Sequence, residues 1–178
     1  VPTGQINVEV HPLAPNPLVI IAPRNHPLVG RTNIPLARIA EEPIILREPG
    51  SGTRDATGRL FEQHGLKPKV GMELGSNEAI KHAIVGGLGL SVLSLHTLTL
   101  EGVNGPVAML DVEGFPIVRQ WRIVHPKGRE LSPVAQAFLE FALAREDMIC
   151  GRLQRAWPNL PEVATRAPGA EPGKTAAE

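Results

Sequence analysis

Alternating and continuous apolar runs predict the strands of this protein. Residues 5–9 alternate polar with apolar side chains, as in a half-buried strand, whereas residues 18–21 are all apolar, as in a strand covered on both faces. Residues 11–17 lie between these runs and contain three prolines, so we expect a connector there. Further apolar runs predict strands at residues 43–46, 69–74, 88–95, 107–110 and 117–125.

Apolar residues at helical spacing predict four helices between and after these strands. Ser76 is a natural N-cap for one of them, and Pro133 suits the first turn of another, because that position needs no N–H. Since strands and helices alternate, we expect an α/β fold with a parallel or mixed sheet. The predicted helices cover residues 35–41, 55–64, 76–86 and 132–145.

Composition limits the classes of function that the chain can have. With 178 residues, 42% of them hydrophobic, it can bury the core of one or two small domains. Lysine plus arginine equal aspartate plus glutamate, 18 against 18, so the net charge gives no general attraction to DNA. The single cysteine, Cys150, excludes an intrachain disulfide and a cysteine-based zinc site.

The two ends of the chain also carry information. The sequence begins with Val1 in strand-like sequence, and we interpret it as a fragment. No apolar stretch approaches the ~20 residues of a membrane span and no signal peptide is visible, so we expect a cytoplasmic protein without membrane contact. Residues 147–178 are expected to form a C-terminal tail, which the Pro, Gly, Ala and Glu content predicts to be disordered from about residue 157.

The most informative local sequence is residues 47–54, between a predicted strand and a predicted helix. A strand, a glycine-bearing turn and a helix start point unbonded N–H groups and the positive end of the helix dipole at one place. Ser51, Thr53 and Arg54 add two hydroxyls and a cation, so we predict binding of a carboxylate or phosphate. The alternative is an ordinary turn whose glycines only satisfy the backbone. The candidate residues are Gly50, Ser51, Gly52, Thr53 and Arg54.

A second helix start offers a further set of donors. Gly75 precedes the capping residue Ser76, and Asn77 follows it, although a plain helix cap explains the same pattern. Two helix starts that face one cleft would suit a doubly anionic ligand. Glu48 could accept a hydroxyl of that ligand or simply be solvated.

Sequence signatures of catalysis, metals and cofactors are incomplete in this chain. The Gly50-Ser51-Gly52 run is not the G-x-S-x-G nucleophile elbow, and Asp55 stands where the dinucleotide fingerprint needs its third glycine. The six histidines and three aspartates show no local metal-ligand spacing such as H-x-x-x-H. We therefore expect no catalytic residues, no metal site and no cofactor.

Five stretches, in order, carry a resemblance to a known family. They are residues 47–54 (REPGSGTR), 73–81 (ELGSNEAIK), 85–97 (VGGLGLSVLSLHT), 111–125 (DVEGFPIVRQWRIVH) and 131–143 (LSPVAQAFLEFAL). Together they resemble the effector-binding domain of LysR-type transcriptional regulators, and in particular the regulators of Calvin–Benson–Bassham carbon-fixation genes. The resemblance covers about residues 8–144.

The resemblance implies a type 2 periplasmic-binding-protein-like fold, in which the effector lies in a cleft between two α/β subdomains. It implies mostly the second subdomain with a partial first one. The DNA-binding domain and the linker helix of the family have no counterpart in this sequence, so promoter DNA is expected to bind only through an absent N-terminal domain. The implied division is residues 1–17 as a remnant of subdomain I and first crossover, 18–113 as subdomain II, and 114–146 as the second crossover, return strand and C-terminal helix of subdomain I.

The resemblance also implies a function and further site residues. It implies an effector-sensing domain for a small anionic, phosphorylated metabolite or a reduced dinucleotide, and it brings Ser94 and His96 near the cleft. A lone histidine such as His96 is more often structural. The full-length protein is expected to be a homo-oligomer and this fragment a monomer. A solute receptor of transport type and, less favoured, a small-molecule enzyme are the alternatives.

Overall fold

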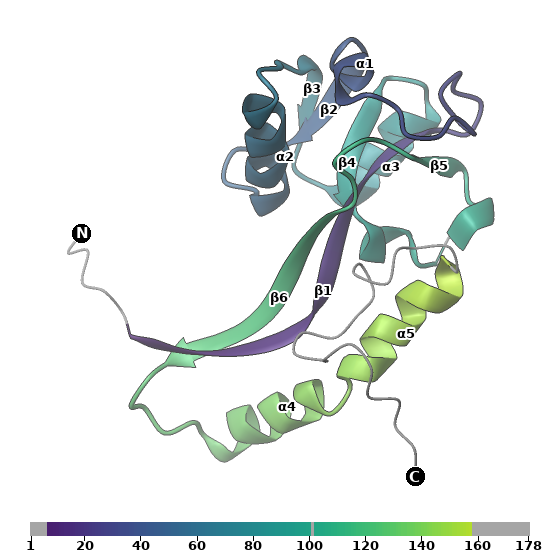
Figure 1. The fold of residues 1–178 in the computed structure, drawn as a ribbon. Helices are drawn as coiled ribbons and strands as arrows, with labels where there is room; N and C mark the ends of the chain where they lie inside the picture. Colours follow the sequence, from purple (N-terminus) through teal and green to yellow (C-terminus); the bar gives the residue numbers. More distant parts are fainter. Residues whose placement is uncertain (1–6, 101, 158–178) are drawn as a thin grey trace. The chain divides into compact units, whose positions relative to one another are not determined.

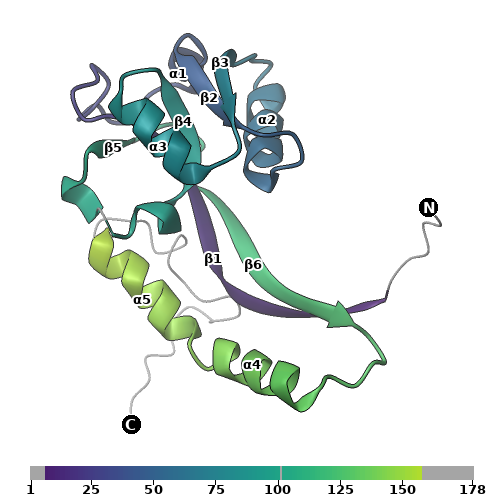
Figure 2. The same ribbon diagram turned by 180° about the vertical axis from the view of Figure 1, so that it is seen from behind.

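The computed structural model describes residues 7–100 and 102–157, which form two compact units. One unit consists of residues 17–118, and the other is built from the chain on either side of that range. Strand β1 (Val8–Pro23) contributes to both units, and Figures 1 and 2 show it beside strand β6.

A mixed sheet forms the centre of the unit 17–118. Its strand order is β3-β2-β4-β1-β5. Strand β2 runs parallel to β3 and β4, whereas β1 is antiparallel to β4 and β5, which confirms the expected α/β fold with a mixed sheet. The further strands are β2 (Pro43–Arg47), β3 (Lys69–Leu74), β4 (Leu90–Ser94) and β5 (Val107–Leu110).

Helices follow the parallel strands of this sheet and provide part of its core. Leu18 and Ile20 of β1 pack in one cluster with Phe61 of helix α2. Val19 and Ile21, which alternate with them, are buried as well, so both faces of β1 are covered. This double burial is why residues 18–21 are continuously apolar. The helical segments are α1 (Leu36–Ala40), α2 (Gly52–Gln63), α3 (Asn77–Val85) and the 3-10 helices η1 (Leu95–Leu98) and η2 (Gly102–Asn104).

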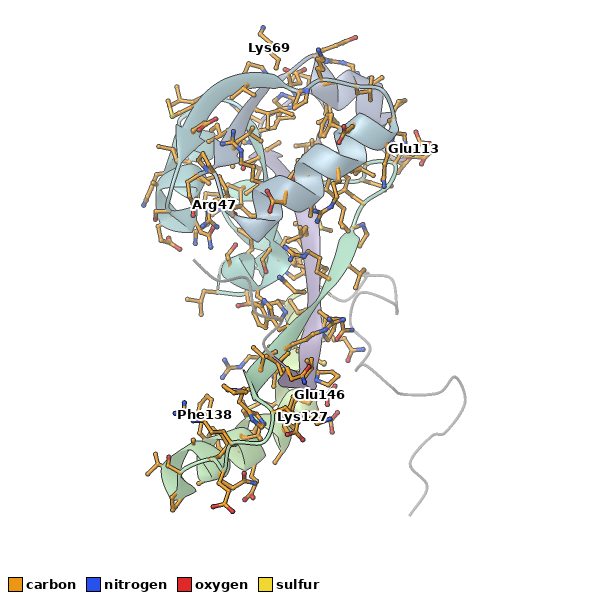
Figure 3. All side chains as sticks on the ribbon, turned by 90° about the vertical axis from the view of Figure 1, so that its left-hand side faces the viewer. Arg47, Lys69, Glu113, Lys127, Phe138 and Glu146 are labelled. Carbon is orange, nitrogen blue, oxygen red and sulfur yellow. The ribbon has the colours of Figure 1, made fainter. Side chains whose placement is uncertain are left out.

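The second unit pairs the first part of β1 with β6 (Ile117–Pro126) and adds two helices. Helix α4 (Pro133–Leu143) begins as expected, since the Ser132 hydroxyl accepts a hydrogen bond from Ala135 N at 3.3 Å. Phe138 of α4 is 62% exposed, and Figure 3 labels it. Helix α5 (Glu146–Ala156) follows and buries Leu153.

Three expectations about secondary structure were wrong. Residues 11–17 belong to the continuous strand β1, because proline fixes φ at a value compatible with extended backbone even though it removes a donor. Helix α2 begins three residues before the predicted residue 55, at Gly52. Residues 146–156, for which no helix was predicted, form helix α5; its interior contains Gly151, which weakened the helical signal. The predicted disorder after residue 157 lies outside the described residues.

Candidate anion-binding site at the ends of three parallel strands

The candidate site residues gather at one edge of the sheet in the unit 17–118. Strands β2, β3 and β4 run in the same direction, so their carboxyl ends, at Arg47, Leu74 and Ser94, point to one edge. The turn into α2, the start of α3 and the segment after β4 all begin there. Carboxyl edges of parallel strands are where α/β proteins bind their ligands.

The turn after β2 presents the first N–H groups of α2. Gly50 has φ +86°, a left-handed conformation that favours glycine, and Ser51 N donates to Glu48 O at 3.2 Å. Ser51 is the N-cap residue of α2, but its side chain makes no capping hydrogen bond. Helix geometry gives the amides of Gly52 and Thr53 no intrahelical acceptor. The turn therefore presents N–H donors and two half-buried hydroxyl residues, Ser51 and Thr53.

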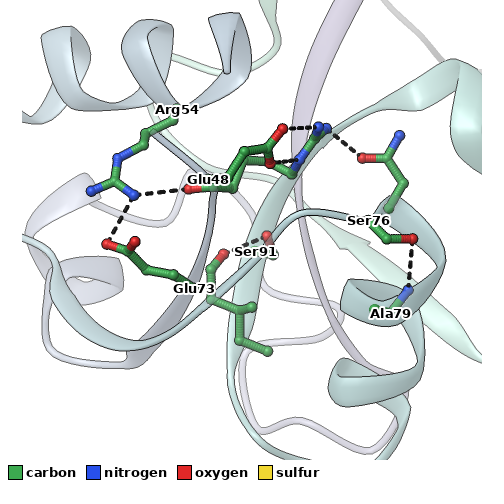
Figure 4. A network of polar contacts seen from close by, with 9 residues as sticks. Glu48, Arg54, Glu73, Ser76, Ala79 and Ser91 are labelled. Atoms are coloured by element: carbon green, nitrogen blue, oxygen red, sulfur yellow. Dashed lines mark hydrogen bonds and ion pairs between the residues drawn. The ribbon is translucent and has the colours of Figure 1, made fainter. Parts of the chain in front are cut away.

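Arg47, the last residue of β2, organises the polar network that Figure 4 shows. Its Nε and Nη2 atoms lie 2.7 and 2.8 Å from the two carboxylate oxygens of Glu48, and its Nη1 donates to Asn77 Oδ1 at 2.7 Å. The hydrogen bonds from Arg47 are the main reason that the pKa of Glu48 is lowered. Arg47 thus connects the end of β2 with the first residue of α3.

Arg54, in the first turn of α2, is held by neighbouring groups. Its Nη1 lies 2.8 Å from Oε1 of Glu73 and donates to the carbonyl oxygen of Arg47 at 3.0 Å (Figure 4). This pairing raises the pKa of Arg54 and lowers that of Glu73. The expected cation is therefore at the helix start, but it shares its charge with a carboxylate. Direct contact of Arg54 with an anion stays a prediction.

A side-chain hydrogen bond caps the start of α3. The Ser76 hydroxyl accepts a hydrogen bond from Ala79 N at 3.4 Å, and the Asn77 side chain is engaged by Arg47. Gly75 precedes this cap, and a Cβ built on it meets no atom within 4 Å. Ser76 thus serves as a helix cap, which is the simpler of the two interpretations that the sequence allowed for this helix start.

The segment after β4 completes the edge. Ser94 is the N-cap residue of η1, and its carbonyl oxygen accepts a hydrogen bond from the Thr97 hydroxyl at 2.7 Å. The Lys81 ammonium of α3 donates to Thr97 O at 3.3 Å, which ties α3 to η1. Ser94 and His96 are both half-buried. They belong to the same strand-end edge as the turn at Gly50.

Two site residues escaped the sequence interpretation. Arg47 was recognised only as part of a motif, yet its guanidinium joins Glu48 to Asn77. Glu73 likewise was recognised only as part of a motif, at the first position of residues 73–81, although it pairs with Arg54. The available signal was that both residues lie at the ends of strands that a parallel sheet brings together. A hollow of about 350 Å³ elsewhere on the unit, lined by Phe61, Leu66 and Pro68 among others, does not include the turn.

Comparison with known proteins agrees with this fold. The family model "LysR substrate binding domain" matches residues 3–147. The chain is 49% identical over 148 residues to the HTH-type transcriptional activator CmpR of Synechocystis, covering 83% of this chain and 49% of CmpR. It is 51% identical over 144 residues to a RuBisCO operon transcriptional regulator of Allochromatium vinosum, covering 81% and 48%. The chain thus spans about half the length of these curated relatives.

A solved structure gives a match in three dimensions. The regulatory domain of Synechocystis CcmR, determined in complex with 2-PG, superposes with a TM-score of 0.75 at 47% identity, covering 81% of this chain and 69% of that one. The fold and the strand-end edge therefore define a type 2 periplasmic-binding-protein-like α/β domain. The chain belongs to the LysR substrate-binding domain family, as its sequence blocks suggested. In the part of the chain that the structure describes, none of the helices has the length and apolar character to cross a membrane.

Proposed function

We propose that this chain is the effector-sensing domain of a LysR-type regulator of carbon-fixation genes. The proposed effector is a small phosphorylated anion that binds at the carboxyl edge of β2, β3 and β4. The observation that carries this proposal is the start of α2, where Ser51 does not cap the helix and leaves N–H groups available for an anion. The complex of the 47% identical CcmR domain with 2-PG supports the same class of ligand.

The charges around the turn support an anion over a cation or a neutral ligand. Arg47 and Arg54 both lie at the turn, and among the described residues Arg47 pairs with the Glu48 carboxylate and Arg54 with the Glu73 carboxylate. An arriving phosphate would replace or share these carboxylates as the acceptor of charge-assisted hydrogen bonds. The dipole of the twelve-residue helix α2 adds positive potential at the same place.

The regulatory role rests on the relatives rather than on the site. Curated relatives are transcriptional regulators, which points away from an enzyme and from a transport receptor. We infer that ligand binding shifts the domain between conformations of different affinity, as any effector must do. Contact with promoter DNA is proposed for a part of the full-length protein outside this chain, and the action is proposed to be cytoplasmic, where that DNA is. The zero net charge of the chain agrees with this division.

Calorimetric titration of the chain with 2-phosphoglycolate (2-PG) tests the proposal. Ribulose bisphosphate, phosphoenolpyruvate and NADPH are the competing candidate effectors. The decisive variant is Ser51→Asp. Aspartate is a good N-cap residue, so it should keep or raise the stability of α2 while its carboxylate occupies the amides and repels the ligand. We expect binding to fall by about tenfold or more.

Arg59→Ala is the matched control, because Arg59 is an exposed cation on the same helix but outside its first turn. It should bind 2-phosphoglycolate as the unchanged chain does. If Ser51→Asp and the unchanged chain bound all these anions equally, the site would not be at the start of α2. If no anion bound at all, the sensor proposal for this chain would fail.

A further inference from the structure

The unit built from the start and the end of the chain contains a cluster of metal-binding side chains. Glu9 and His11 lie on β1 at positions i and i+2, so their side chains project from the same face of the strand. His125 lies on β6, which pairs with β1. Directly beyond the ends of these two strands, Lys127 N donates a hydrogen bond to Asn7 O at 2.8 Å, and Figure 3 labels Lys127.

The ligand atoms of the cluster converge on one point. Nε2 of His11 lies 3.1 Å from Nε2 of His125, and the two imidazole rings stack with centroids 5.2 Å apart. Oε2 of Glu9 lies 3.8 Å from Nε2 of His125, and all three ligand atoms lie within 4.8 Å of one another. Two ligand nitrogens about 2.0–2.1 Å from one ion at a tetrahedral angle would be separated by about 3.3 Å. The observed separation is close to that value.

The second ring nitrogen of His125 supports metal binding. Nδ1 of His125 lies 3.3 Å from the carbonyl oxygen of Pro126. A carbonyl oxygen can only accept, so this contact is a hydrogen bond in the tautomer that carries its proton on Nδ1, and in that tautomer the lone pair of Nε2 is directed at the cluster. Metal-binding histidines are usually oriented in this way by a backbone carbonyl.

The geometry points to a binding site for a divalent transition-metal ion, formed by Glu9, His11 and His125. Two imidazoles and a carboxylate suit ions such as Zn²⁺, Cu²⁺ and Ni²⁺ rather than Mg²⁺ or Ca²⁺, which prefer oxygen ligands. The Glu9 side chain is 54% exposed and that of His125 is 16% exposed, so an ion can enter and keep a water molecule as a further ligand. A bound ion would connect β1 to β6 through side chains.

Titration of the chain with Zn²⁺ by calorimetry tests this site. We expect one ion per chain, and we expect His11→Ala and His125→Ala each to weaken binding by about 100-fold or more, since losing a ligand costs at least as much as losing its supporting contact. Glu9→Gln should weaken it by about tenfold. His82→Ala is the matched control, because His82 is exposed on α3 and far from the cluster in sequence; it should bind Zn²⁺ unchanged.

A second measurement needs no variant. Electron paramagnetic resonance of the chain with one equivalent of Cu²⁺ should show coupling to two imidazole nitrogens. Absence of that coupling would overturn the site, as would a chain that fails to bind Zn²⁺ at 1 mM (~4 kcal/mol). Equal loss of affinity in His82→Ala and His125→Ala would also overturn it, because the ion would then be bound elsewhere. Titration with 2-phosphoglycolate should be unaffected by His125→Ala, so the two proposals can fail separately.

Discussion

The Nη1 atom of Arg54 lies 2.8 Å from Oε1 of Glu73, across the gap between the start of α2 and strand β3. The same guanidinium nitrogen donates to the carbonyl oxygen of Arg47, so Arg54 joins two neighbouring strands of the sheet. The pair holds the cation beside the amides of α2 and offsets its charge with a carboxylate. An anionic ligand would have to compete with Glu73 for Arg54.

Removal of the Glu73 charge is therefore expected to strengthen anion binding. Glu73→Gln keeps a hydrogen-bond acceptor for Arg54 but leaves the guanidinium charge unbalanced, so the affinity for 2-phosphoglycolate should rise about two- to fivefold at low salt. Glu62→Gln, which removes an equal exposed charge near the other end of α2, should change it less. Calorimetry at two salt concentrations measures the affinity of both variants for 2-phosphoglycolate. Weaker binding in Glu73→Gln would mean that Glu73 orients Arg54 rather than competes with the ligand.

The same pair gives stability a defined dependence on pH. The hydrogen bond from Arg54 lowers the pKa of Glu73 below its ordinary value of 4.5. The pair therefore stabilises the folded chain fully above about pH 5, and this contribution is lost as the pH falls through the lowered pKa. Denaturant titrations of the unchanged chain and of Glu73→Gln should differ at pH 7 and converge in acid. A difference that grew toward acid pH would contradict this assignment.

The two serine N-caps should respond differently to substitution. Ser76 accepts a hydrogen bond from Ala79 N, so Ser76→Ala should lower the free energy of unfolding by about 1 kcal/mol. Ser51 makes no such bond, so Ser51→Ala should cost less. Urea unfolding of both variants compares them directly. An equal loss in both would show that Ser51 caps α2 in solution.

Gly89 and Gly58 should give opposite results when changed to alanine. A Cβ on Gly89, directly before β4, would clash with the carbonyl oxygen of Pro43, and the φ of Gly89 is +148°. Gly89→Ala should therefore destabilise the unit 17–118 by about 2 kcal/mol or more. A Cβ on Gly58, inside α2, meets no atom within 4 Å, so Gly58→Ala should stabilise by about 0.5–1 kcal/mol. Thermal unfolding of each variant shows whether its melting temperature falls or rises relative to that of the unchanged chain.

Cys150 should react slowly with thiol reagents. It lies on α5 and is 8% exposed, and burial raises the pKa of its thiol, with Glu146 and Asp147 adding to the shift. Little thiolate is therefore present at neutral pH, and the thiolate is the reactive form. Labelling of the native chain with a disulfide reagent should be about tenfold or more slower than labelling in urea. Equal rates would show that α5 opens readily.

Much of the fold followed from local patterns. The continuous apolar run at residues 18–21 predicted a strand buried on both faces, and Ser76 predicted the start of α3, because both signals depend on residues close in sequence. Helix α5 was missed, since Gly151 and a short apolar face give it a weak local signal. The path of β1 through three prolines was missed because pairing with distant strands, rather than propensity, keeps that segment extended.

The polar partners could not be predicted in the same way. Arg54 was identified from the motif, but its pairing with Glu73 depends on the parallel register of β2 and β3. Likewise, His11 and His125 are 114 residues apart and meet only because β1 pairs with β6, so a search for local metal-ligand spacing excluded them. Contacts of this kind require the sheet topology, which a single sequence does not specify.

The uncapped start of α2 would couple the stability of this helix to binding of the proposed anion. Because Ser51 leaves the first N–H groups without an acceptor, an incoming phosphate would itself serve as the cap, and its binding energy would appear as added resistance of α2 to fraying. A side chain that accepted hydrogen bonds from these N–H groups would stabilise α2 and, by the same change, abolish its affinity for the proposed anion.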